Sequence, residues 1–317
     1  MTRRWWWLML LALLCSPSSA VQGAEKPLAE LVWNARRILF LGDSITAAGP
    51  YVANFDTWLV AQKRPQTPVV INAGLPSETV SGLSEEGHAG GQFPRPDLAE
   101  RLERVLNVAQ PDLVIACYGM NCGIYQPFDK DRFARYQAGI RQLKQRVEQA
   151  GARLILVTPP FYDDQTSPRP FVYNDVLRQY ADWLLAQREQ GWLVVDLHHA
   201  MTAEVARRRQ TDPKFTFQPD GVHPNDAGHW FVATRLIAAL GDDAAASAEN
   251  PQEMLRQSGV PVELLPLVTE RSQLRRDAYV GAAGHKRPGV AKGLPIPEAE
   301  EAAAKLDAKI KIQSLGK

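Results

Sequence analysis

The chain has 317 residues, of which 45% are hydrophobic, so it is long and apolar enough to bury a sizeable core. Basic and acidic residues nearly cancel, 36 against 35, and this balance gives no indication of a nucleic-acid partner. Its 3 cysteines are too few for a disulfide-stabilised scaffold in a chain of this size.

Residues 1–20 have the pattern of an export signal. Two arginines precede an apolar run over residues 5–14, and small residues at 18–20 offer a cleavage site. The apolar run is short for a bilayer, so we expect no stable membrane span and predict a periplasmic or extracellular protein. A lipid anchor on Cys15 is an alternative that the bulky preceding leucine disfavours.

Cleavage after residue 20 would leave two cysteines, Cys117 and Cys122. They stand near the end of a predicted strand, where a disulfide between them is conceivable. Two cysteines do not make a disulfide framework, and we expect buried free thiols.

Five apolar runs of strand length follow one another at wide spacing, with helical patterns between them. They are Ile38–Leu41, Val69–Asn72, Leu113–Tyr118, Leu154–Thr158 and Leu193–Asp196. Strands that alternate with helices build a parallel sheet covered on both faces. We therefore expect a three-layer α/β/α sandwich with a five-stranded parallel sheet in flavodoxin-like order, over residues 36–240.

The composition changes after residue 240. Residues 241–250 are rich in Gly, Asp, Ala, Ser and Asn, which is typical of a linker. Residues 251–317 contain helix-forming stretches, and the stretch 298–312 is rich in Ala, Glu and Lys. We expect a helical C-terminal extension that either packs on the main domain or mediates association. The sequence leaves this choice and the oligomeric state open.

Polar groups follow several of the predicted strands. They are Gly42-Asp43-Ser44 after the first strand, Asn72-Ala73-Gly74 after the second, Gly119-Met120-Asn121 after the third, and Asp220-Gly221-Val222-His223 beyond the fifth. The carboxyl ends of parallel strands share one edge of the sheet, so these groups can converge there. Taken alone, Ser44 could equally be a helix cap.

Covalent ester hydrolysis needs a nucleophile, a base, a group that orients the base, and hydrogen-bond donors facing the oxyanion. We assign Ser44 as nucleophile, His223 as base and Asp220 as the orienting acid. The backbone amides of Ser44 and Gly74 and the side-chain amide of Asn121 are the predicted oxyanion donors.

The other histidines are weaker candidates for the base. His198 and His199 follow the fifth strand beside Asp196, but adjacent histidines entering a helix are more often capping or surface residues. The remaining three are expected to be structural: His88, His229 and His285. No His or Cys pair has the spacing of metal ligands and no phosphate-binding glycine loop is present, so we expect no metal and no other cofactor.

The four motifs, in this order and spacing, resemble those of the SGNH, or GDSL-type, hydrolases. The resemblance implies a flavodoxin-like fold and metal-independent hydrolysis of esters or thioesters. By the same resemblance Ser44, Gly74, Asn121 and His223 are the name-giving residues, and Asp220 completes the triad.

One position departs from the family, which commonly has an acid where this chain has Cys122. The missing acid is expected to reduce activity without abolishing it. We predict an exported esterase that removes small acyl groups, such as acetyl, from carbohydrate or similar small polar substrates. The alternatives are a lysophospholipase or thioesterase of the same family, and a carbohydrate-binding member without activity, for which Cys122 is the only indication.

Overall fold

The structure is a computed structural model that describes residues 22–314. The predicted export signal and Cys15 lie outside the described residues. Among the described helices, none has the length and apolar character needed to cross a membrane.

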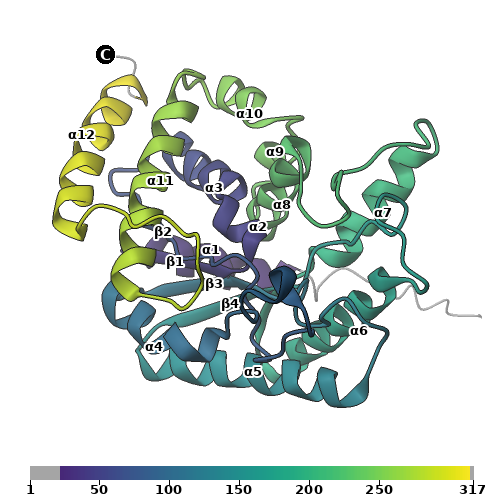
Figure 1. The fold of residues 1–317 in the computed structure, drawn as a ribbon. Helices are drawn as coiled ribbons and strands as arrows, with labels where there is room; N and C mark the ends of the chain where they lie inside the picture. The colour runs from purple at the N-terminus through teal and green to yellow at the C-terminus, as the bar shows by residue number, and fades with distance from the viewer. Residues whose placement is uncertain (1–21, 315–317) are drawn as a thin grey trace, which may run out of the picture.

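A parallel five-stranded sheet forms the centre of the molecule (Figure 1), as predicted. Its order is β2-β1-β3-β4-β5, the order of flavodoxin-like folds. The strands are β1 Arg37–Gly42, β2 Val69–Asn72, β3 Leu113–Cys117, β4 Arg153–Val157 and β5 Leu193–Val195. The apolar residues of β1 are completely buried because helices cover both faces of the sheet.

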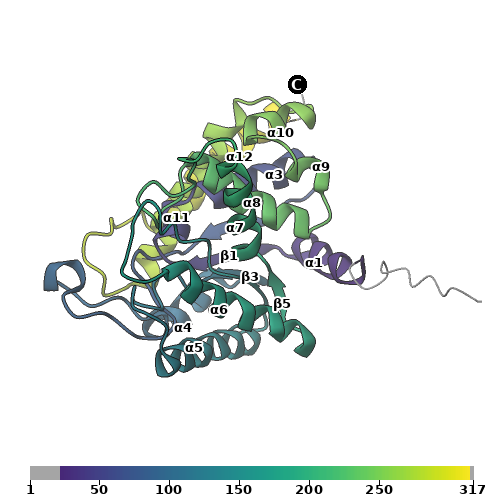
Figure 2. The same ribbon diagram turned by 90° about the vertical axis from the view of Figure 1, so that its right-hand side faces the viewer.

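Two layers of helices enclose the sheet (Figures 1 and 2). One layer consists of α4 Leu98–Ala109, α5 Lys130–Gln149 and α6 Tyr173–Ala186. The other consists of α1 Gln22–Asn34, α3 Pro50–Ala61 and α8 Asp226–Ala239. Shorter or peripheral elements are α2 Ser44–Ala48, the 3₁₀ turns η1 His88–Gly91 and η2 Gln187–Gln190, and α7 His198–Arg209. The predicted three-layer sandwich is confirmed.

The C-terminal extension is helical and packs on the rest of the chain. It contains α9 Asp243–Ala246, α10 Pro251–Gln257, α11 Leu264–Ala283 and α12 Ile296–Ser314. Helix α11 contacts α3, β2 and α4, and α12 packs on α11 (Figure 1). The stretch expected to be a linker is not extended. Asp242, which caps the N-terminus of α9, accepts hydrogen bonds from the side chains of Trp58 of α3 and of Gln62, the residue that follows α3.

Two buried arginines attach α11 to its neighbours, and we call this cluster the arginine clamp. Arg271 donates to Asp56 of α3 at 2.7 Å and also pairs with Asp307 of α12. Arg275 pairs with Asp307 at 3.1 Å and with Glu300 at 3.2 Å. Both arginines are about 5% exposed and Asp56 is 2% exposed, whereas Glu300 and Asp307 are partly exposed, so the Arg271–Asp56 pair is the interior part of the clamp.

Candidate active site

Ser44 is the first residue of α2, directly after the turn that ends β1. The Asp43 side chain accepts a hydrogen bond from the Ile45 amide at 3.0 Å and so caps the helix. Gly42 is required at the turn, because an added Cβ would lie 2.0 Å from the Thr46 hydroxyl oxygen. The turn therefore places the Ser44 hydroxyl at the carboxyl edge of the sheet.

His223 and Asp220 lie in the loop before α8. They form a hydrogen-bonded series in which Asp220 contacts His223 and His223 contacts Ser44. His223 Nε2 is 2.8 Å from Ser44 Oγ, and His223 Nδ1 is 2.7 Å from Asp220 Oδ2. The second Asp220 oxygen accepts the backbone amides of Val222 and His223 at 2.9 and 2.7 Å. The structure thus brings His223 into hydrogen-bond contact with Ser44, which is 179 positions away in the sequence.

The ionisation of Asp220 suits this arrangement. Partial burial opposes ionisation, but the hydrogen bonds from His223 and from the Val222 and His223 amides outweigh it and lower the pKa of Asp220. A carboxylate is therefore present at neutral pH to hold the Nδ1–H of His223. The side chains of His223 and Asp220 are 50% and 57% exposed, so the series opens directly to solvent.

Asn121 follows β3 and is almost completely buried. Its Oδ1 accepts the Tyr125 hydroxyl at 3.0 Å, and its Nδ2 donates to the Glu78 carbonyl at 3.3 Å. These contacts fix the amide orientation and engage only one of the two Nδ2 hydrogens. The second hydrogen is available to an oxyanion, as is the Ser44 amide, which lies at the unpaired start of α2.

The predicted role of Gly74 does not fit the geometry. Its amide donates to Asn72 Oδ1 at 2.9 Å, while Asn72 Nδ2 donates to the Thr46 carbonyl at 2.6 Å. A Cβ at Gly74 would lie 2.4 Å from the Ala47 amide nitrogen. The glycine is therefore needed for close packing against α2, and its amide hydrogen is not free to bind an oxyanion.

The same loop offers a different backbone donor. Ser77 adopts a left-handed backbone with φ of +68°, which is uncommon for a residue other than glycine. Its amide has no hydrogen-bond acceptor in the part of the chain that the structure describes. It precedes Glu78, whose carbonyl accepts a hydrogen bond from Asn121, so Ser77 belongs to the loop that contacts Asn121. No sequence pattern marks this residue.

A buried ion pair connects the loops that carry these donors. Arg101 of α4 binds both carboxylate oxygens of Glu78 at 2.6 and 2.7 Å and donates to the Ala73 carbonyl at 2.7 Å. The Tyr118 hydroxyl also donates to Glu78 at 2.6 Å. Glu78 and Arg101 are at most 1% exposed, so this network fixes the loops after β2 and β3 relative to each other.

The rim beside Asn121 is formed by an aromatic ring between two arginines. Tyr125, with φ of +54°, contacts the guanidinium groups of Arg95 and Arg169 at 5.2 and 4.8 Å from the ring centre. Arg95 is held by Glu85 through two hydrogen bonds of 2.6 Å. Loops that follow β2 and β4 therefore both reach the edge of the site.

The rival histidines are engaged elsewhere. His199 bonds with Asp196 and with Asp182, at 3.1 and 3.0 Å. His198 is buried at the start of α7, and burial lowers its pKa to about 4. His229 is also buried and stacks on Tyr51. In residues 22–314, no three or more His, Cys, Asp or Glu side chains gather closely enough to hold a metal ion.

Cys117 and Cys122 are both buried and free, in agreement with the prediction. Burial raises the pKa of the Cys122 thiol to about 12, opposed by the backbone amides of Val80 and Ser81. The thiol is therefore protonated and packs behind the loop that carries Asn121.

A three-layer fold with serine, histidine and aspartate in hydrogen-bonded series at the carboxyl edge of its sheet is the architecture of a hydrolase. Residues 40–231 match the model of the GDSL-like lipase/acylhydrolase family. This match covers more than half of the chain, and the chain belongs to that family. It is accordingly a carboxylic ester hydrolase, and the resemblance to SGNH hydrolases is confirmed.

Solved structures show the same fold. A gut microbial diltiazem-metabolizing enzyme is 20% identical, with a TM-score of 0.50, over 65% of this chain and 47% of that one, so the match spans about half of that enzyme. An alpha/beta hydrolase enzyme from the metagenome of Lake Arreo, Spain, is 24% identical, with a TM-score of 0.50, over 65% of this chain and 95% of that one.

A catalytic mutant of an acetylxylan esterase from Geobacillus stearothermophilus is 25% identical, with a TM-score of 0.49, over 65% of this chain and 94% of that one. A comparison with curated proteins found no match.

Proposed function

We propose that the protein is an exported serine esterase with Ser44 as nucleophile, His223 as general base and Asp220 as the orienting acid. The observation that carries this proposal is the hydrogen-bond series of 2.8 Å from Ser44 Oγ to His223 Nε2 and 2.7 Å from His223 Nδ1 to Asp220. Its order and lengths are those that general-base activation of a serine requires.

The reaction proceeds through an acyl-enzyme. Ser44 Oγ attacks the ester carbonyl carbon while its proton passes to His223 Nε2. The tetrahedral oxyanion accepts hydrogen bonds from the Ser44 amide and Asn121 Nδ2, with the Ser77 amide in the place predicted for Gly74. His223 then gives the proton to the departing alcohol oxygen, and the carbon–oxygen bond to the alcohol breaks. Water attacks the acyl group by the same route and restores Ser44.

The substrates are small acyl esters, such as acetyl esters, of carbohydrates or similar polar alcohols. Two features support this choice. The series opens directly to solvent, with His223 half exposed, so a large polar alcohol can approach it. The rim carries the exposed guanidinium of Arg169 against the Tyr125 ring rather than a wide apolar surface suited to a fatty chain.

The test is hydrolysis of p-nitrophenyl acetate by purified protein and by Ser44→Ala. Loss of the nucleophile should reduce kcat by about 10⁴-fold or more, as in other triad hydrolases. Asp220→Asn should cost less than His223→Ala, since it removes only the orienting charge. If Ser44→Ala hydrolyses as fast as the parent, the triad assignment is wrong. A preference for octanoyl over acetyl esters would instead favour the lysophospholipase or thioesterase alternative.

Export is tested separately. The full-length chain should be recovered outside the cytoplasm with an N-terminus generated after residue 20, as determined by mass spectrometry. Recovery of the uncleaved chain in the cytoplasm would contradict this part of the proposal. A mature protein that begins with a lipidated Cys15 would replace secretion by anchoring.

A further inference from the structure

A cavity of about 780 Å³ lies between the C-terminal extension and the catalytic part of the chain. Its size is within the range of about 300–1,000 Å³ common for ligand sites. Both parts of the chain line it, and six of the lining residues are Asn54, Asp226, Trp230, Asn250, Ser272 and Arg276. The last three lie beyond residues 40–231, so one wall is not part of the family domain.

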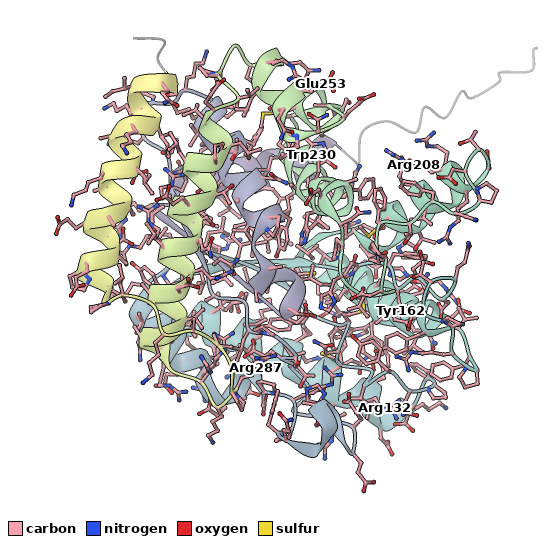
Figure 3. The ribbon with its side chains drawn as sticks, turned by 45° about the horizontal axis from the view of Figure 1, so that its top comes forward. Arg132, Tyr162, Arg208, Trp230, Glu253 and Arg287 are labelled. Atoms are coloured by element: carbon pink, nitrogen blue, oxygen red, sulfur yellow. The ribbon has the colours of Figure 1, made fainter. Side chains whose placement is uncertain are left out.

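The cavity adjoins the catalytic series. Ala48, at the end of α2, lines it, and Ser44 begins the same helix about 6 Å away at 1.5 Å per residue. On the side of the site that carries His223, the lining residue Asp226 begins α8 three positions after His223. Figure 3 shows Trp230 and Arg208, which line the cavity from α8 and α7. A substrate held in the cavity can therefore extend to Ser44.

Buried polar side chains face this space without protein partners. Asn54 is 7% exposed and Ser272 is 5% exposed, and both line the cavity. Within residues 22–314, neither side chain makes a hydrogen bond to the protein, and their polar atoms stay accessible from the cavity. An amide and a hydroxyl placed in this way, on α3 and α11, point to a ligand that carries hydrogen-bonding groups.

The charges of the lining argue for a neutral ligand. The lining contains two arginines, Arg208 and Arg276, and two acids, Asp226 and Glu249, so its formal charges cancel. Both arginines are already bonded, Arg208 to a glutamate of its own helix and Arg276 to Asp277 and the carbonyl of residue 47. Arg276 is therefore not free for a phosphate or carboxylate, and Arg208 bonds to a glutamate that it shares with Arg207.

The remaining polar groups of the lining are mostly amides. Gln252 and Gln273 add two exposed amides to that of Asn54, and each amide can donate and accept hydrogen bonds. Hydroxyl groups also donate and accept, so a polyhydroxylated chain can satisfy them. Pro50, Trp230 and Leu265 supply apolar surface for the C–H faces of sugar rings.

We propose that this cavity binds the alcohol part of the substrate, a neutral oligosaccharide that extends from the acylated hydroxyl at Ser44. The C-terminal extension is then a specificity-determining element of the esterase. This inference rests on the proposed esterase function and adds to it the polymeric nature of the alcohol and the surface that recognises it.

The test compares a small ester with an acetylated oligosaccharide. Gln273→Trp places a large ring in the cavity from an exposed position on α11, and Gln257→Trp is the matched control on α10, outside the cavity. The ratio of kcat/KM for acetylated xylo-oligosaccharide to that for p-nitrophenyl acetate should fall about tenfold or more in Gln273→Trp, mainly through KM. The ratio should stay at the parent value in Gln257→Trp. An unchanged ratio in Gln273→Trp would overturn the proposal.

A binding measurement separates this proposal from the catalytic one. The Ser44→Ala protein is titrated calorimetrically with unacetylated xylo-, cello- and chito-hexaose. We expect binding of at least one of them, weakened by the added Gln273→Trp change. Binding of none of the three would overturn the cavity proposal even where Ser44-dependent hydrolysis of p-nitrophenyl acetate stands. Binding by Ser44→Ala without hydrolysis of p-nitrophenyl acetate by the parent would refute the catalytic proposal and leave the cavity as an oligosaccharide-binding site, no longer one for the alcohol part of a substrate.

Discussion

The edge of the sheet that carries Ser44 and the arginine clamp both bury a carboxylate, but among the described residues only the carboxylate of the clamp is bonded to a cation. In the clamp, Arg271 is bonded to Asp56 and Asp307, so each buried charge has an opposite charge beside it. At the catalytic edge, Asp43 is 3% exposed, and in the described part of the chain its hydrogen bond comes from the Ile45 amide alone. Burial raises the pKa of the aspartate in both places, but in the clamp the bonded Arg271 offsets part of that cost, whereas no cation within residues 22–314 is bonded to Asp43.

The pKa of Asp43 shows the cost. Burial raises it from 3.8 to about 6, against the lowering effects of the Ile45 amide, His223 and Arg95. A folded-state pKa above the unfolded value means that the folded state binds the proton more tightly. The ionised carboxylate therefore destabilises the fold above pH 6, and this penalty disappears as the pH falls below 4. A loss of folding stability caused by a group next to a nucleophile is typical of residues that are retained for activity.

The largest expected effect is on the clamp. Arg271→Met should lower the free energy of unfolding by about 3–5 kcal/mol at pH 7, because it leaves Asp56 buried and unpaired. The loss should shrink at pH 5, where Asp56 can take up a proton. Urea unfolding at the two pH values measures both effects.

The matched control is an exposed pair. Arg178→Met removes contacts to Asp175 and Asp182, all about half exposed, and should change the free energy of unfolding by less than about 1 kcal/mol. Equal losses in the two variants would show that the clamp contributes no more than a surface ion pair. The contrast between the bonded carboxylate of the clamp and the carboxylate of Asp43 would then be unsupported.

Asp43→Asn should act in the opposite direction. Asparagine keeps an acceptor for the Ile45 amide but carries no charge, so the variant should be more stable than the parent above pH 7. The pKa rise from 3.8 to about 6 sets an upper limit of about 3 kcal/mol, at 1.36 kcal/mol per pH unit. The gain should vanish near pH 4.

The same variant should lose activity. The Asp43 carboxylate interacts favourably with protonated His223, the form in which the base exists in the transition state. We expect kcat to fall by up to about tenfold, or about 1.4 kcal/mol of barrier. A variant that is less stable at pH 8, or equally stable from pH 4 to 8, would show that Asp43 is not a destabilising charge.

The sequence predicts the sheet and the catalytic series well, for a local reason. Each central strand is a continuous apolar run, which is what burial on both faces requires. The residues that follow those strands share one edge by topology, so Ser44 and Asn121 could be placed together, and His223 is assigned by elimination among the histidines and by the family resemblance.

The remaining features depend on contacts that leave no local pattern. Gly74 carries the expected glycine, but the Asn72 side chain engages its amide, and Ser77 takes a left-handed backbone that its sequence does not signal. Arg271 and Asp56 are 215 positions apart, so their pairing could not be inferred. The attachment of the extension and the cavity beneath it were therefore beyond prediction.

The smallest expected effect comes from adding a second carboxylate near Asp43. The amides of Val80 and Ser81 approach the Cys122 thiol, as does the buried hydroxyl of Ser81. Cys122→Asp gives these neutral donors an acceptor, so hydrogen bonds should stabilise the new carboxylate without the opposite charge that the clamp supplies.

Turnover of p-nitrophenyl acetate by Cys122→Asp should equal that of the parent or exceed it by up to about tenfold, through firmer placement of Asn121. Cys122→Ala, which adds no acceptor, is the control and should give no gain. A clear loss in the aspartate variant together with normal turnover in the alanine variant would mean that this edge does not tolerate a further charge even when donors are in place. In that case Asp43 lacks a bonded partner because this edge disfavours carboxylates in general. Its charge would then not be one retained for catalysis.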